Sequence, residues 1–174
     1  MNQQLTHHQI QWKEQRFPLI VACDNWKDPL NVGAAFRLAD AFGVAELWLG
    51  GTTPAPPNKR IHKTARSADK WIPFRVIPDL GAFLSSLERD TYLIAGVEIT
   101  TESRLLQHAF TQNGDMSKTV VLVAGAENEG LSVSVINTLH TCVHIPMYGH
   151  NSSLNVATAL AVTLYEVTNR LHSL

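Results

Sequence analysis

A cluster of hydroxyl and amide side chains stands just before the last helix that the sequence predicts. The loop 148–153 is polar, and an amphipathic helix pattern follows it over 153–171. Asn151, Ser152 or Ser153 could cap this helix, because their side chains accept hydrogen bonds from the unpaired N–H groups of a first turn. The same N–H groups, at the positive end of the helix dipole, also favour a bound ligand. The loop is therefore either an ordinary helix cap or part of a binding site.

A second set of polar residues follows the apolar run 19–23, which is typical of a buried strand. Asn31 could cap a helix over 31–42, which ends at Gly43 and carries Arg37 about two turns from its start. Arg37 stands among alanine, phenylalanine and leucine residues. It is either a functional cation or one partner of a helix-surface ion pair.

A third set follows the apolar run 120–124, which leads into a glycine-flanked acidic loop and then a helix. This loop contains Glu127 and Glu129. Polar residues at the carboxyl ends of parallel strands are the usual place for a ligand site in α/β proteins. Glu127 is thus either a site residue or an exposed loop carboxylate.

The elements that must position these side chains alternate along the chain. Apolar runs predict strands over 18–24, 45–50, 72–77, 91–98, 119–124 and 141–146, and helical patterns cover 31–42, 78–89, 132–139 and 153–171. This alternation predicts an α/β fold, with a mainly parallel sheet and helices on both faces. The sequence contains neither the Gly-x-Gly-x-x-Gly turn that is typical of dinucleotide-binding domains nor a Walker phosphate loop. It therefore gives no support for an ordinary dinucleotide-binding domain.

Three motifs emerge from these segments: Asn-x-Gly-Ala-x-x-Arg, Gly-x-Glu-x-x-Gly-Leu, and Ile-Pro-Met-x-Gly followed closely by Ser-Leu-Asn-Val. The residues that carry them are Asn31, Gly33, Ala34 and Arg37; Gly125, Glu127, Gly130 and Leu131; and Ile145 to Met147, Gly149 and Ser153 to Val156. In this order and spacing they resemble the SpoU (TrmH) family of RNA ribose 2′-O-methyltransferases, within the SPOUT superfamily. The resemblance spans residues 18–170, and three ordered motifs are far more specific than one.

The resemblance implies a single SPOUT-type methyltransferase domain over 18–174, with a trefoil knot in its C-terminal half. Residues 1–17 are then a polar N-terminal extension. The family also implies a homodimer whose site lies close to the interface. Its reaction transfers a methyl group from S-adenosylmethionine to a ribose hydroxyl of RNA. Because the sulfonium is already activated, positioning and electrostatic stabilisation of the developing alkoxide can serve without a metal.

Five residues match the family's catalytic positions. By resemblance Arg37 is the key catalytic residue, and the family's arginine is often proposed as the base. Because arginine stays protonated in proteins, we expect Arg37 to hold a phosphate and stabilise the oxyanion. The family pattern places Asn31 beside the acceptor ribose, makes Glu127 orient Asn31 or the Arg37 region, and includes Ser153 and Asn155. We expect Asn155 one turn into the last helix, where its cost in helix propensity favours a hydrogen-bonding role.

The cofactor residues also follow from the resemblance. Family members hold the adenine and ribose mainly through backbone groups of the loops that form the knot. The matching residues are Leu122, Val123, Ala124, Gly125, Ile145, Pro146, Met147, Ser153 and Leu154.

The most basic part of the chain is 59–75, which holds six lysines and arginines against Asp69 alone. The segment carries about +5, whereas the whole chain carries −1. Such a patch suits the phosphates of RNA, and the candidate contacts are Lys59, Arg60, Lys63 and Arg66. Trp71 either stacks on a base or, like most large aromatic residues, is buried. A minimal domain with this patch favours tRNA as the substrate, with ribosomal RNA as the alternative.

Composition and cysteine use are typical of a cytoplasmic globular protein. Of the 174 residues, 45% are hydrophobic, and no apolar run has the length of a membrane span or forms a signal core in the first 16 residues. Cys23 and Cys142 lie in apolar strand patterns and are expected to be reduced core thiols. His140, Cys142 and His144 alternate on one strand, but zinc would need a further ligand or an open position, and we expect no metal.

Two other functions stay open. The chain could be an RNA-binding protein that kept the fold and lost methyl transfer, although passive binding requires none of the five catalytic-site residues. It could also methylate a base instead of a ribose. That reaction would be expected to need an acid or base near the acceptor nitrogen.

Overall fold

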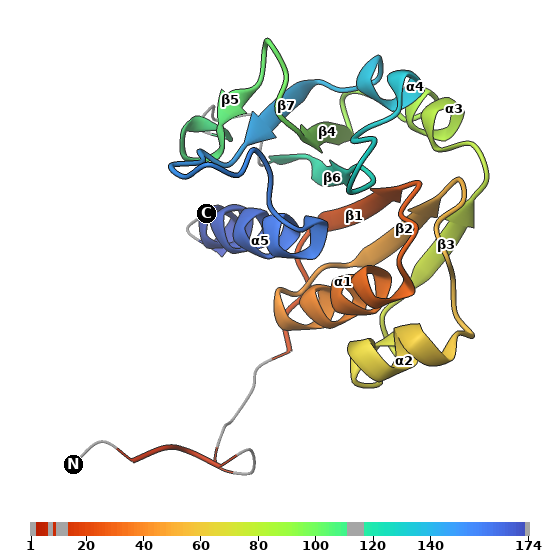
Figure 1. Cartoon of the computed structure of the whole chain (residues 1–174), viewed down its shortest axis with the longest axis vertical. Helices are drawn as coiled ribbons and strands as arrows, with labels where there is room; N and C mark the ends of the chain where they lie inside the picture. The colour runs from red at the N-terminus through yellow and green to blue at the C-terminus, as the bar shows by residue number, and fades with distance from the viewer. Residues whose placement is uncertain (1–2, 7–8, 10–13, 111–116, 173–174) are drawn as a thin grey trace.

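A seven-stranded parallel sheet forms the centre of the computed structural model, which describes residues 3–6, 9, 14–110 and 117–172 (Figure 1). Within these residues the strand order is β3-β2-β1-β6-β4-β7-β5. The strands are β1 (Leu19–Asp24), β2 (Glu46–Gly50), β3 (Phe74–Ile77), β4 (Tyr92–Val97), β5 (Arg104–Leu105), β6 (Thr119–Ala124) and β7 (Thr141–His144). The predicted parallel α/β sheet is confirmed.

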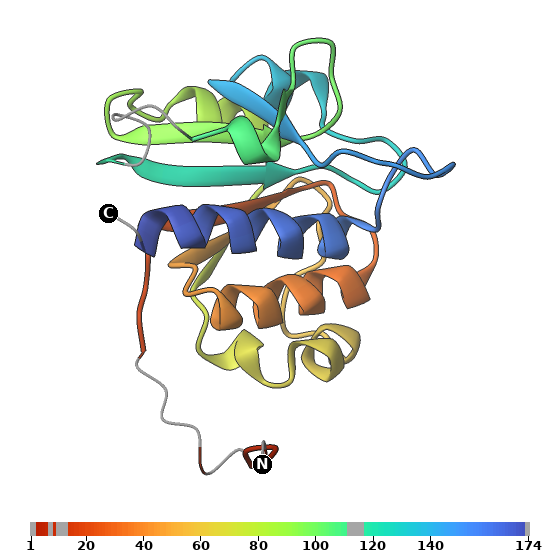
Figure 2. The ribbon, with the colours of Figure 1, turned by 90° about the vertical axis from the view of Figure 1, so that its left-hand side faces the viewer.

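Helices cover both faces of the sheet, as predicted (Figure 2). On one face lie α1 (Pro29–Ala41), α2 (Lys59–Ala65) and α5 (Val156–His172), whose buried residues include Phe36, Ile61 and Leu164. On the other lie α3 (Leu80–Ser85) and α4 (Val133–Ile136), which pack their apolar residues around Trp48. The sheet therefore separates two hydrophobic clusters.

The two central strands explain the apolar runs that predicted them. Every residue of β1 is buried, and β6 is buried from Val120 to Ala124, because helices cover both sides of each strand. Their carboxyl ends lie side by side, since Cys23 pairs with Ala124. The polar segments after Asp24 and after Ala124 therefore leave the sheet next to each other.

Both predicted helix caps were wrong. The N-cap of α1 is Asp28, whose side chain accepts from the Leu30 N–H, and the helix begins at Pro29 instead of Asn31. Proline suits the first helical position because its missing N–H would be unpaired there. The last helix begins at Val156 instead of residue 153, and its cap is Asn155, not Asn151, Ser152 or Ser153. Asn155 is therefore favoured where it stands, and the predicted cost in helix propensity does not arise.

Helix α2 and strand β5 were not predicted. Seven residues are too few for a clear period, but the sequence did contain a signal: Asn58 caps the helix by accepting from Arg60 and Ile61, and Ile61 and Ala65 are buried four residues apart. Helices were predicted over 78–89 and 132–139, but α3 and α4 are shorter than these ranges. Their flanking residues form turns.

The two cysteines differ in burial. Cys23 is fully buried as predicted, and burial raises the pKa of its thiol. Cys142 is only half-buried, so its assignment to the core was wrong, and its Sγ donates to the Glu98 carbonyl.

Among the described residues no group of three metal-ligating side chains comes together. No helix in this part of the chain is both long and apolar enough to span a membrane.

His140 predicts how stability depends on pH. Its Nδ1 accepts from the Ile94 N–H at 2.8 Å, while its buried Nε2 has no partner in the described structure. Burial, with the nearby cations Arg89 and Lys118, holds the pKa of His140 below its ordinary value. The unfolded chain then binds a proton more readily, so this contribution to stability is present above about pH 6.5 and is lost as the pH falls below it. We expect His140→Asn to weaken the fall in the urea midpoint between pH 8 and pH 5.

The exposed histidine His108 offers the matched control. His108→Asn should follow the wild-type pH dependence. Equal pH dependence of wild type and His140→Asn would contradict the assignment.

Candidate functional site

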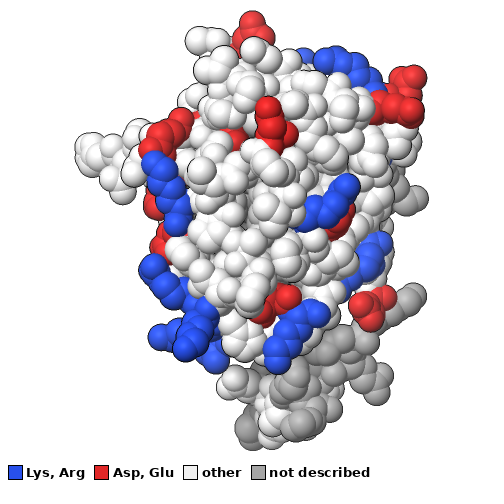
Figure 3. Space-filling model, turned by 90° about the vertical axis from the view of Figure 1, so that its right-hand side faces the viewer, with Lys and Arg blue, Asp and Glu red and all other residues white. Residues whose placement is uncertain are grey.

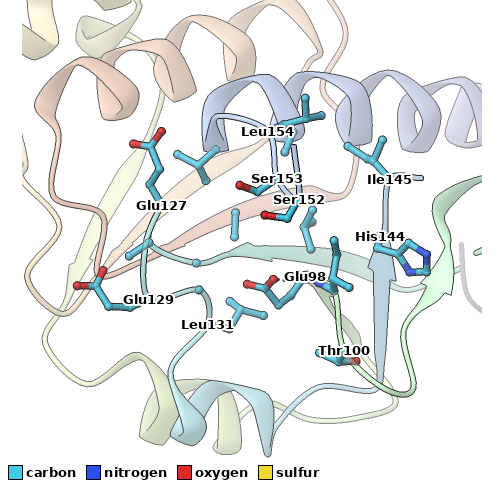
Figure 4. A pocket seen from close by; sticks show the side chains of 18 of the residues that line it. Glu98, Thr100, Glu127, Glu129, Leu131, His144, Ile145, Ser152, Ser153 and Leu154 are labelled. Carbon is cyan, nitrogen blue, oxygen red and sulfur yellow. Dashed lines mark hydrogen bonds between the residues drawn. The ribbon is translucent and has the colours of Figure 1, made fainter. Parts of the chain in front are cut away.

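A cavity of about 590 Å³ lies beyond the carboxyl ends of β4, β6 and β7, against the start of α5 (Figure 4). Four segments line most of it: 97–100 after β4, 124–131 after β6, His144, Ile145 and Met147 after β7, and 152–154 before α5. This is the edge of a parallel sheet at which ligands bind in α/β proteins. Two of the three sequence motifs therefore contribute directly to one cavity.

The acidic loop after β6 is shaped by two backbones in close contact. A Cβ atom on Gly125 would lie 2.1 Å from the carbonyl carbon of Gly130, so only glycine fits. Ala126 and Gly130 exchange two backbone hydrogen bonds and close the loop around Glu127. Beyond the loop, the Ser132 N–H donates to the buried carboxylate of Asp24 at 2.7 Å. The loop is thus fixed both to itself and to β1.

Asn155 connects all three motifs through one side chain. Its Nδ2 donates to Asn31 Oδ1 at 3.1 Å and to Glu127 Oε1 at 3.3 Å. Its Oδ1 accepts from the backbone N–H groups of Ala157 and Thr158 at the start of α5. The cap fixes which end of the amide faces outward, so the NH2 group must point toward Asn31 and Glu127. Since Asn31 accepts with its oxygen, its own NH2 group is left to donate elsewhere.

The residues expected to hold a cofactor divide into two groups. Six line the cavity: Ala124, Gly125, Ile145, Met147, Ser153 and Leu154. Leu122 and Val123 are fully buried within β6, and Pro146 is not part of the cavity lining. The lining mixes apolar side chains with polar ones, among them three carboxylates and the hydroxyls of Ser152 and Ser153, which Figure 4 shows near Leu154.

Arg37 is exposed on α1 and lies outside the cavity lining. Its guanidinium forms no hydrogen bond or ion pair with any other residue that the structure describes, so the helix-surface ion pair is absent there. Six residues separate it from Asn31, about 9 Å along the helix axis. The guanidinium is therefore available to a partner outside this part of the chain.

The four candidate RNA-binding cations lie on or directly after α2, and all are exposed. Figure 3 shows lysines and arginines gathered on the lower part of one face, the level at which α2 lies in Figure 1. Arg60 is paired with Asp28 at 3.2 Å, whereas Lys59, Lys63 and Arg66 have no ion pair within the described structure. Trp71 is 52% exposed, so the buried alternative was wrong, and its Nε1 donates to Asp40.

The motifs missed Glu98, Thr100 and His144, which also line the cavity. Glu98 and Thr100 follow β4, and His144 ends β7, where Ser103 Oγ lies 2.9 Å from its Nδ1. The position of Glu98 directly after an apolar strand was the available signal, as it was for Glu127. Glu129, also in the lining, is bound by Lys27, which holds the pKa of that carboxyl below its ordinary value.

Several proteins to which this chain is similar are named as RNA methyltransferases. A 23S rRNA (guanosine-2′-O-)-methyltransferase of Ralstonia nicotianae is 31% identical over 88% of this chain and 59% of its own. An AdoMet-bound rRNA methyltransferase structure from Sinorhizobium meliloti matches 91% of the chain and 58% of its own, at 27% identity with a TM-score of 0.80. A third structure comes from a study of the 2-OH methylation of C/U34 on tRNA. It aligns with 89% of this chain and with 96% of its own chain, at 26% identity with a TM-score of 0.74.

The chain spans between 59% and 64% of the length of the first curated relatives that it matches. The model of the SpoU rRNA Methylase family matches residues 18–165, which include all three motifs. The chain belongs to the SpoU rRNA methylase family.

Proposed function

We propose that this protein transfers a methyl group from S-adenosylmethionine to a ribose 2′-hydroxyl of RNA, with tRNA as the substrate. The observation that carries the proposal is the hydrogen-bonded group Asn31–Asn155–Glu127, which joins the three family motifs at the edge of the cavity. Passive RNA binding requires no such group. The family match and the relatives named for ribose methylation support the same reaction.

The cavity fits S-adenosylmethionine in size and chemistry. Its volume of about 590 Å³ is within the range of small-molecule sites. Gly125 lets the backbone of the acidic loop approach closely, and Ser153, Leu154, Ile145 and Met147 offer backbone groups and apolar contact for an adenosine. When bound, the cofactor supplies an electrophilic methyl group on a positively charged sulfur, which suits a lining that contains carboxylates.

The chain's own residues position the acceptor and stabilise its charge. Asn31, held by Asn155, presents a fixed NH2 donor for the acceptor ribose. Arg37 binds an RNA phosphate and stabilises the oxygen as it loses its proton. In this proposal it acts as a fixed positive charge and not as the base.

The substrate proposal rests on the basic surface and on a similar protein that is named for tRNA methylation. Lys59, Lys63 and Arg66 form an exposed cationic patch, and such a patch suits the phosphates of RNA. The relative named for tRNA C/U34 methylation is matched over 96% of its length, whereas the 23S rRNA enzyme is matched over 59%. The match to a structure named for tRNA methylation supports tRNA as the substrate, with ribosomal RNA as the alternative.

We propose a homodimer as the active form. The outward side of α5 carries Val162 and Tyr165, which are 41% and 61% exposed, on a helix that begins at the site. A second copy of the chain that covers this side of α5 would lie close to the cavity of each protomer. The cationic patch of the second copy would then widen the surface available to RNA. Sedimentation of the protein at micromolar concentration tests this assembly.

Arg37→Ala separates chemistry from cofactor binding. We expect methyl transfer to unmodified tRNA to fall at least about 100-fold, as when an oxyanion donor is removed. Cofactor affinity should remain unchanged, because Arg37 does not line the cavity. Transfer of a labelled methyl group, with calorimetry of cofactor binding, measures both. Arg37→Lys should restore only part of the activity, because it keeps the charge and loses the planar fork.

Several results would contradict this proposal. Full activity of Arg37→Ala would exclude its catalytic role, and label found on a base after digestion to nucleosides would exclude ribose methylation. Cofactor binding with transfer to ribosomal RNA only would overturn the tRNA assignment. Absence of both cofactor binding and transfer would favour a catalytically silent RNA-binding protein.

Gly125→Ala tests the shape of the acidic loop. The added methyl group would overlap Gly130, so we expect cofactor affinity to fall more than tenfold and the free energy of unfolding to fall by about 1–3 kcal/mol. Gly149→Ala is the matched control, because a Cβ there meets no atom within 4 Å. Calorimetry and urea unfolding compare the two variants, and equal effects would contradict the role of the Gly125 contact.

The cationic patch predicts a salt-dependent contact with RNA. Lys63→Gln combined with Arg66→Gln should weaken tRNA binding and lower the slope of log affinity against log salt by roughly 1 per lost phosphate contact. Arg89→Gln removes an exposed cation after α3, on the opposite face of the sheet, and serves as control. Filter binding at several salt concentrations measures the slope. An equal loss in the control would indicate only a general charge effect.

A further inference from the structure

Glu98 places a carboxylate inside the cavity without a cationic partner. Its Oε1 accepts from the Ile99 N–H at 2.9 Å, and its Oε2 faces Gly130, where an added Cβ would come within 2.5 Å of it. Figure 4 shows the carboxylate in the cavity beneath Ser152. The residue is half-buried, and no lysine or arginine among the described residues forms an ion pair with it. Its position is thus fixed while its charge is left uncompensated.

The rest of the lining adds negative charge and no positive side chain. Of its three carboxylates, Glu129 is paired with Lys27, whereas Glu127 accepts from the neutral amide of Asn155. No lysine or arginine lines the cavity within the described chain. A cationic ligand therefore enters a field of Glu98 and Glu127, and Coulomb attraction is stronger there than in bulk water.

Methyl transfer changes the charge of the small molecule in this cavity. The bond between methyl carbon and sulfur breaks, its electron pair stays on sulfur, and a bond forms from the methyl carbon to the ribose oxygen, which releases its proton to water. The sulfonium, with a net charge of +1, becomes a thioether with a net charge of zero. Substrate and product thus differ in one methyl group and one unit of charge.

We propose that Glu98 makes the cavity select the cationic sulfonium cofactor over its neutral thioether product. The inference rests on the proposed function, because it concerns the same cavity. Its consequence is that the product binds more weakly than the cofactor and leaves without competing with the next molecule. Shape alone would separate the two ligands only a little, because they differ by one methyl group.

Three ligands separate charge from shape: S-adenosylmethionine, S-adenosylhomocysteine, and an analogue in which a protonated amine replaces the sulfonium. Calorimetry on the wild-type protein should show that both cations bind more tightly than the thioether. In Glu98→Gln, which keeps the acceptor for Ile99, affinity for both cations should fall about five- to tenfold. A tenfold loss corresponds to about 1.4 kcal/mol. Thioether affinity should change less than about twofold, which also shows that the cavity is still folded.

Two further variants keep the test decisive. Glu98→Asp retains the charge and should recover most of the selectivity, and Glu102→Gln removes an exposed carboxylate outside the cavity and should leave all three affinities unchanged. Equal losses for the thioether and the cations, or an unchanged ratio in Glu98→Gln, would overturn the proposal while leaving the proposed function intact. Failure of all three ligands to bind wild type would overturn both.

Discussion

The site depends on the contact between two stretches of backbone at Gly125 and Gly130. Because Gly125 has no side chain, the chain can turn back on itself directly after β6 and form the closed acidic loop. The buried Asp24 carboxylate then holds the exit of that loop against the end of β1. A loop that carries so many polar groups is usually mobile, but here its backbone hydrogen bonds fix the direction of Glu127.

Asn155 turns that fixed loop into a connected site. Its oxygen serves the first turn of α5, so the amide cannot rotate without losing the cap, and its nitrogen is held toward Glu127 and Asn31. One side chain thereby relates three segments that are distant in sequence. This geometry requires an amide, which offers an oxygen to the helix and an NH2 group to Glu127. An aspartate at this position could cap the helix but would repel Glu127.

Much of this architecture could be predicted from the sequence. The buried runs of β1 and β6 predicted the sheet, and the three motifs identified the segments that meet at the cavity or beside it. The helix starts were wrong because several residues near each start were plausible caps, and Asp28 and Asn155 were chosen by geometry that depends on neighbouring segments. Glu98 escaped notice because it belongs to no motif, and only the folded sheet brings the end of β4 next to the loop after β6. The knot and the homodimer that the resemblance implies stay predictions.

The packing of α1 on α2 has a consequence for how a nucleotide is selected. A Cβ on Gly33 would lie 2.5 Å from the Ile61 carbonyl oxygen, so the two helices are in backbone contact. Asn31 and Arg37 are on one helix and the exposed cations are on the other, so this backbone contact fixes where the two groups lie relative to each other. For an RNA whose phosphates contact α2, the packed helices α1 and α2 would fix a distance along the RNA. Under the proposed function, helix packing would set the distance from the docked phosphates to the acceptor ribose, and that distance would determine which nucleotide along the strand can react.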